Sequence, residues 1–87
     1  MSNFDLIDRL CARRVQDAIT QYGILDLRND KRSWIRELQA ELLDAINYAR
    51  WAIAKGELSE DVGQGIIWVL KNIFWCHILP IFPPEEK

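Results

Sequence analysis

The sequence predicts an all-α fold, a three-helix antiparallel bundle that oligomerisation completes. Apolar residues recur at three- and four-residue intervals in three segments, glycines or capping side chains separate these segments, and none has the alternation typical of a strand. We expect helices over residues 3–22, 31–55 and 59–79 within a single helical domain, 1–82, and a flexible tail over 83–87.

The 3–22 helix is predicted by one apolar stripe. Its members are Phe4, Ile7, Cys11, Val15, Ala18, Ile19 and Tyr22. Residues at this spacing share one face of a helix, and Gly23 is a suitable residue to end it.

The 31–55 helix has the clearest pattern in the chain. Its expected core stripe is Ile35, Leu38, Leu42, Ala45, Ile46, Ala49 and Ile53. Asn29 and Asp30 carry side-chain oxygens that can accept the unpaired amide hydrogens at a helix start, so we expect the helix to begin near Lys31. Gly56 lies just beyond its expected end.

The 59–79 helix begins with a capping residue, Ser59, and is apolar on every side. Such a helix must be surrounded, either by a bilayer or by protein. Lys71, Asn72 and His77 interrupt the apolar run, which makes a membrane an unfavourable environment. We therefore expect a homo-oligomer that forms through this helix.

Composition and the N-terminal sequence indicate which partners and which cellular compartment to expect. The chain has 87 residues, with 11 Lys and Arg against 13 Asp and Glu, so no net positive charge favours nucleic acid. The N-terminus lacks the pattern of a secretion signal, and we expect a cytoplasmic protein. Cys11 and Cys76 stand at apolar positions without metal-ligand spacing, which predicts reduced core residues.

Three carboxylates and a phenol share one face of the 31–55 helix. At about 100° of rotation per residue, Glu37, Glu41, Asp44 and Tyr48 fall within roughly 60° of one another, and we expect this face beside the core stripe. Like charges at this spacing repel, and a divalent cation would reverse that cost. Carboxylate oxygens favour magnesium or manganese over zinc.

Aromatic and basic residues lie near these acids. Trp34 and Trp51 flank them, while Arg32 and Arg36 at the start of the helix are candidates for holding a polyphosphate. The alternative is that the acids are only solvated, or that they form i,i+4 pairs with the neighbouring basic residues. The tryptophans have a similar alternative, because aromatic residues at helical spacing often pack in a core or an interface.

Other catalytic patterns are missing from the sequence. There is no glycine-rich phosphate loop, no Cys/His metal cluster and no nucleophile elbow. His77 is the sole histidine, and one imidazole at the end of an apolar helix is more typical of a structural residue.

The stretch from Trp34 to Ile53 resembles the metal-binding helix of the MazG-like, all-α nucleoside triphosphate pyrophosphohydrolases. The resemblance implies that Glu41 and Asp44 are catalytic and bind magnesium (or manganese) together with Glu37. It implies cleavage of a nucleotide between its α and β phosphates, with Arg32 or Arg36 steadying the phosphates. Tyr48, Trp34 and Trp51 are the further candidates for contact with the substrate.

The chain departs from this family in the 3–22 helix. The family's first acidic motif, Glu-Glu-x-x-Glu, is missing there, and Asp5, Asp8 and Asp17 stand in a different pattern. A second subunit's Glu41 and Asp44 could complete the metal site, Glu60 and Asp61 could do so, or catalysis could have been lost.

Two hypotheses about function follow. The first is a small phage-like or bacterial nucleotide pyrophosphohydrolase of the MazG type, which converts a nucleoside triphosphate to the monophosphate and pyrophosphate. The second is a non-enzymatic helical binding protein, which either sequesters nucleotides or docks on a larger protein through its aromatic and acidic surface.

Overall fold

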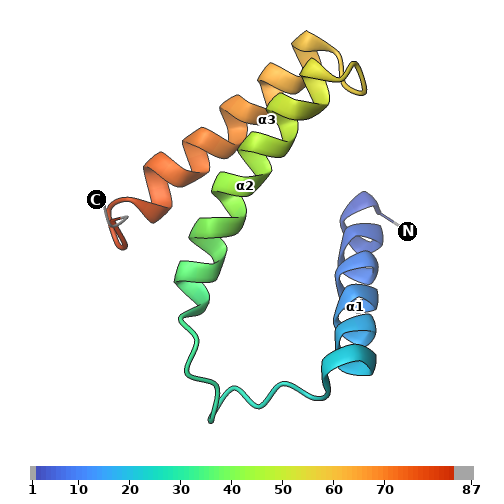
Figure 1. The fold of residues 1–87 in the computed structure, drawn as a ribbon, viewed down its shortest axis with the longest axis vertical. Helices are drawn as coiled ribbons and strands as arrows, with labels where there is room; N and C mark the ends of the chain where they lie inside the picture. The colour runs from blue at the N-terminus through green and yellow to red at the C-terminus, as the bar shows by residue number, and fades with distance from the viewer. Residues whose placement is uncertain (1, 84–87) are drawn as a thin grey trace. The chain divides into compact units, whose positions relative to one another are not determined.

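All regular structure in the computed structural model, which describes residues 2–83, is helical (Figure 1). The elements are α1 (Asn3–Tyr22), α2 (Trp34–Ala54), α3 (Glu60–Ile73) and the π-helix η1 (Phe74–Ile78), which continues α3 without a break. No strand occurs among residues 2–83, so the predicted all-α class is confirmed. Residues 84–87 of the expected tail lie outside the described residues.

The chain divides into two compact units, Met1–Lys31 and Arg32–Lys87, and each is described by itself. The first unit contains α1, and the second contains the antiparallel pair formed by α2 and α3. The single domain, the three-helix bundle and its completion by a second subunit stay predictions.

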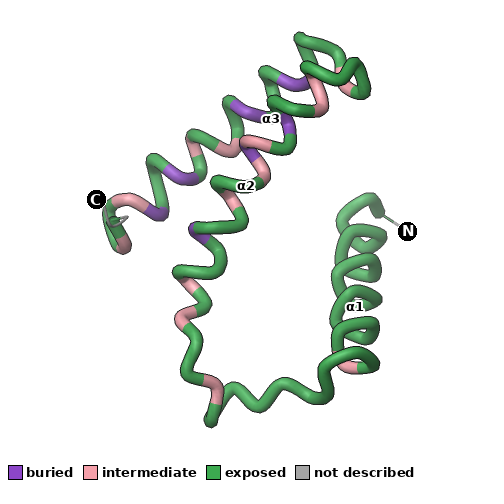
Figure 2. Tube along the Cα trace, viewed as in Figure 1, coloured by how far each residue is buried: buried purple, intermediate pink, exposed green. Residues whose placement is uncertain are grey.

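Helix α1 has the predicted bounds and is capped at both ends. The Ser2 hydroxyl accepts the amide hydrogen of Asp5, and the Asp5 carboxylate accepts that of Ser2, each at 3.1 Å. At the other end Gly23 has a φ of 90°, and its amide hydrogen is donated to the Ile19 carbonyl at 2.8 Å. None of the helix is buried (Figure 2). Cys11 is exposed within this unit, and its place in a core between the helices stays a prediction.

Helix α2 begins at Trp34, later than the predicted residue 31. Its cap is Ser33, whose hydroxyl accepts the amide hydrogen of Arg36 at 3.3 Å. The Asn29 side chain instead donates to the Asp26 carboxylate at 2.7 Å within a preceding turn. The expected cap at Asn29 and Asp30 was therefore wrong, because Ser33 is the residue that binds an amide hydrogen of the first helical turn.

The core of the second unit lies between α2 and α3, which run side by side (Figure 1). Its buried cluster consists of Ile46, Ala49 and Ile67, with Ile53 and Leu70 packed against it. Ile46 and Ala49 belong to the predicted stripe, which they confirm in part. Leu38, another member of that stripe, is exposed, because α3 covers a narrower sector of α2 than the stripe occupies.

Helix α3 begins as predicted after Ser59, whose hydroxyl accepts the amide hydrogen of Val62 at 3.3 Å. The α-helical geometry ends at Ile73, earlier than the predicted residue 79, and the π-helix continues the helical path to Ile78. Beyond the π-helix, the side-chain amide of Gln39 in α2 donates a hydrogen bond to the Phe82 carbonyl at 3.0 Å. This hydrogen bond holds the C-terminal turn against α2.

One side of the α3 segment is buried and the other is not. Phe74 and Ile78 are buried, whereas Val62, Trp68 and Val69 are at least half exposed. Cys76 is also exposed, which makes its predicted core position wrong. Within residues 2–83, no helix combines the length and the apolarity that crossing a membrane requires. The homo-oligomer through this helix stays a prediction.

Candidate functional site: the two outer surfaces of α2

The acidic ridge of α2, defined as Glu37, Glu41, Asp44 and Tyr48, lies on consecutive turns of one unbroken helix, as predicted. All four residues are exposed. Ile46 is buried against α3 and lies two residues after Asp44, which corresponds to about 200° of rotation. The ridge therefore points away from α3, and its predicted place beside the buried core is wrong.

The carboxylates of the ridge are not neutralised by ion pairs within the described part of the chain. None of Glu37, Glu41 and Asp44 forms an ion pair with another described residue. The i,i+4 pairs with basic neighbours that the sequence left open are therefore not formed among residues 2–83. Acids at this spacing repel one another along a helix, so a positively charged partner would be favoured here.

Aromatic rings adjoin the C-terminal end of the ridge. The Tyr48 and Trp51 rings lie 5.9 Å apart between centroids, tilted by 56°. Both side chains remain more than 60% exposed, Tyr48 at 61% and Trp51 at 63%. A tilted pair of this kind is a favourable aromatic arrangement, and it leaves both rings accessible to a partner.

The aromatic and basic residues at the start of α2 contact one another. The Arg32 guanidinium lies 4.6 Å from the centroid of the Trp34 ring, and that of Arg36 lies 4.7 Å from the Phe82 ring. Both are cation–π contacts. The two arginines expected to hold phosphate are thus each placed over an aromatic ring.

The carboxylates that the sequence offers as metal ligands all lie on one face of α2. Glu37, Glu41 and Asp44 provide the hard oxygens that magnesium or manganese prefers. Within the described part of the chain, however, no group of three or more His, Cys, Asp or Glu side chains is arranged to hold a metal ion. A metal on the ridge would need further ligands from beyond this helix face, such as a second copy of the chain.

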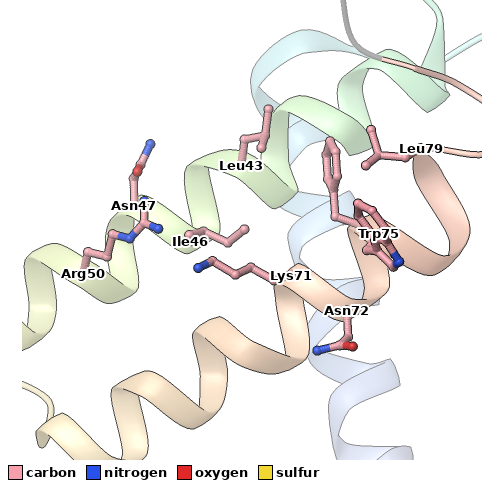
Figure 3. Close-up of a pocket in the computed structure, with 9 residues that line it drawn as sticks. Leu43, Ile46, Asn47, Arg50, Lys71, Asn72, Trp75 and Leu79 are labelled. Atoms are coloured by element: carbon pink, nitrogen blue, oxygen red, sulfur yellow. The ribbon is translucent and has the colours of Figure 1, made fainter.

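A groove on the other side of α2 was not predicted from the sequence. It has a volume of about 690 Å³ and is open to solvent along α2, α3 and η1 (Figure 3). Its lining residues are Leu43, Ile46, Asn47, Arg50, Lys71, Asn72, Phe74, Trp75 and Leu79. The sequence signal was the interruption of the apolar 59–79 segment by Lys71 and Asn72, which was interpreted only as evidence against a membrane.

No family model, curated protein or solved structure matches the chain. What the protein does is therefore inferred from these two surfaces of α2.

Proposed function

We propose that the chain is a non-enzymatic helical binding protein that docks on a larger protein through the acidic ridge of α2 and the adjoining Trp51. The observation that carries the proposal is the exposure of an aromatic pair, Tyr48 and Trp51, beside carboxylates that have no ion-pair partner among residues 2–83. The rings would supply most of the affinity, and the acids would supply orientation.

The spacing along α2 suits the mode in which a helix lies in a partner's groove. Glu37, Asp44 and Trp51 follow one another at seven-residue intervals, with Glu41 and Tyr48 between them. This stripe is about 21 Å long at 1.5 Å per residue. Anchors at such intervals are typical of helix-in-groove recognition.

The charge of the ridge indicates what the partner's surface contains. A carboxylate buried in an interface without a partner costs several kcal/mol more than one that meets Lys or Arg. The partner therefore presents an apolar pocket for Trp51 with basic side chains along one edge. Because association steered by charge depends on ionic strength, salt lowers its rate.

Site-specific photo-crosslinking tests this proposal. A benzoylphenylalanine introduced in place of Trp51 should crosslink one defined protein in cells, whereas the same group in place of Trp68 on α3 should not. Trp68 is a matched control because it is similarly exposed, at 66%. The binding of that purified protein should then weaken by about thirtyfold or more in Trp51→Ala, the effect of losing an interface hot spot, and little in Trp68→Ala. Crosslinks that do not depend on the position, or unchanged affinity in Trp51→Ala, would contradict the proposal.

The second candidate is a MazG-like nucleotide pyrophosphohydrolase that depends on magnesium or manganese. The observation that favours it is the presence on one helix face of three carboxylates, Glu37, Glu41 and Asp44, that form no ion pair with residues 2–83. A bound metal ion would supply charge neutralisation at the phosphates and an activated water. Arg32, Arg36 and the nearby rings would contact the nucleotide, and a second copy would complete the ligand set.

Release of pyrophosphate from a panel of nucleoside triphosphates tests this candidate. It predicts metal-dependent release that is lost in Asp44→Asn while the helical circular dichroism is retained. A Glu57→Gln variant, which changes an exposed acid in the turn between α2 and α3, is the control and should keep full activity. Equal release by all three proteins would reveal a contaminating enzyme and would contradict the assignment.

A further inference from the structure

We propose that the groove between α2 and the α3–η1 segment binds a small organic anion with an apolar body, such as an acyl carboxylate. This goes beyond the docking function, because the groove and the acidic ridge are on different sides of α2. Leu43 lines the groove and immediately precedes Asp44 of the ridge, so the two side chains diverge by about 100° around the helix.

Two cations define one end of the groove. Arg50 from α2 and Lys71 from α3 both line it; the Lys71 side chain points toward the space between the two helices, and the Arg50 side chain runs along α2 beside Asn47 (Figure 3). Neither forms an ion pair with a described residue, and no carboxylate is among the lining residues. The two positive charges repel each other, and an anion between them turns that repulsion into attraction from both sides. The charge of the groove therefore selects a negatively charged group.

The other end of the groove suits an apolar body. Trp75 and Leu79 face Leu43 across it (Figure 3), and buried Phe74 contributes to the same lining. Trp75 is 72% exposed, so a ligand that covered its ring would remove a large apolar area from water. An amphiphile with its charge toward Arg50 and its body against Trp75 would satisfy both ends.

The size of the groove and the local backbone agree with a small ligand. A volume of about 690 Å³ lies within the range of roughly 300–1,000 Å³ that is usual for ligand pockets. Phe74 and Trp75 belong to the π-helix, a geometry that is rare and often found at functional sites.

A paired titration with octanoate and octanol tests the proposal, because the two probes share a body and differ in charge. Binding is followed in the native chain by nuclear magnetic resonance, with the indole and amide signals of Trp75 as reporters. Octanoate should bind more tightly than octanol by about tenfold. Arg50→Gln and Lys71→Gln should each weaken octanoate binding by about three- to tenfold and leave octanol binding unchanged, as expected for a partly exposed charge contact.

Matched controls separate this site from other exposed charges and rings. Lys55→Gln removes an exposed cation that lies outside the groove and pairs with Glu57, and should leave octanoate binding unchanged. Trp75→Ala should weaken the binding of both octanoate and octanol, whereas Trp68→Ala should weaken the binding of neither. Trp51→Ala should leave octanoate binding unchanged. A failure of the proposed protein docking through Trp51 is therefore distinguishable from a failure of ligand binding in the groove.

Three results with octanoate and octanol would overturn the proposal. They are equal affinity for octanoate and octanol, equal effects of Lys55→Gln and Lys71→Gln, and octanoate shifts that cluster away from Trp75. Tighter binding of an acidic amphipathic peptide than of octanoate at Trp75 would also overturn it, since the groove would then be a protein-docking surface.

Discussion

The substitution Gly63→Ala should destabilise the pair of helices α2 and α3 by overpacking a close contact between Gly63 and the Ile53 side chain. Gly63 is buried, and a Cβ atom placed there would overlap the Ile53 side chain. Gly65 lies on the same helix with nothing within 4 Å of the corresponding position. Both are helical glycines, so the two alanine variants gain the same intrinsic helix propensity and differ only in what the new methyl group meets.

The expected magnitudes follow from these two terms. Replacing a helical glycine with alanine stabilises by about 0.5–1 kcal/mol, which is the whole effect expected for Gly65→Ala. An extra methyl group in a packed core costs about 1–3 kcal/mol. The free energies of unfolding of the two variants should therefore differ by about 1–3 kcal/mol, with Gly65→Ala the more stable.

Thermal unfolding followed by circular dichroism at several protein concentrations measures this difference. For a domain of this size, each kcal/mol corresponds to a change in Tm of roughly 4–8 °C. The double variant Gly63→Ala with Ile53→Val makes room for the methyl group and should recover part of the loss. Equal Tm values for Gly63→Ala and Gly65→Ala would refute the close contact between the two helices at Gly63.

Three further predictions concern caps and core. Ser33→Ala should lower the free energy of unfolding by about 1 kcal/mol through loss of the α2 cap, with Asn29→Ala nearly neutral for the same helix, as measured by chemical denaturation. Gln39→Met should leave the Phe82 carbonyl without its hydrogen bond, so hydrogen exchange after η1 should speed up and stability should fall by about 1–3 kcal/mol; unchanged exchange would contradict the role of that bond. Ile67→Ala should cost about 2–5 kcal/mol, because Ile67 is only 3% exposed at the centre of the core.

The helical class and most helix ends could be predicted from the sequence because they depend on local chemistry. Ser59 precedes a first turn that contains two acids, and Gly23 can adopt the positive φ that ends α1. The start of α2 was placed too early because Asn29, Asp30 and Ser33 can all cap a helix, and spacing does not rank them. The structure assigns Asn29 to the turn at Asp26 and the cap to Ser33.

The candidate site was predictable only as far as a single helix determines it. A continuous α2 places Glu37, Glu41 and Asp44 on one face, and that part is confirmed. The predicted stripe contained Ile46 and Ala49, which do pack in the core with Ile67, but it was wider than the sector that α3 covers, so the ridge was expected too close to the core. The groove depends on the same pairing and on the π-helix, which has no recognisable sequence pattern.

The measurement that tests the central claim most directly is isothermal titration of the protein with magnesium or manganese, with and without a non-hydrolysable nucleoside triphosphate. It compares the native chain with Glu41→Gln and Asp44→Asn. If the ridge is a surface for docking a protein, all three proteins will give the same small heats with no saturation. Saturable, metal-dependent binding of the nucleotide that both substitutions abolish would contradict the docking function and make the ridge a metal and nucleotide site.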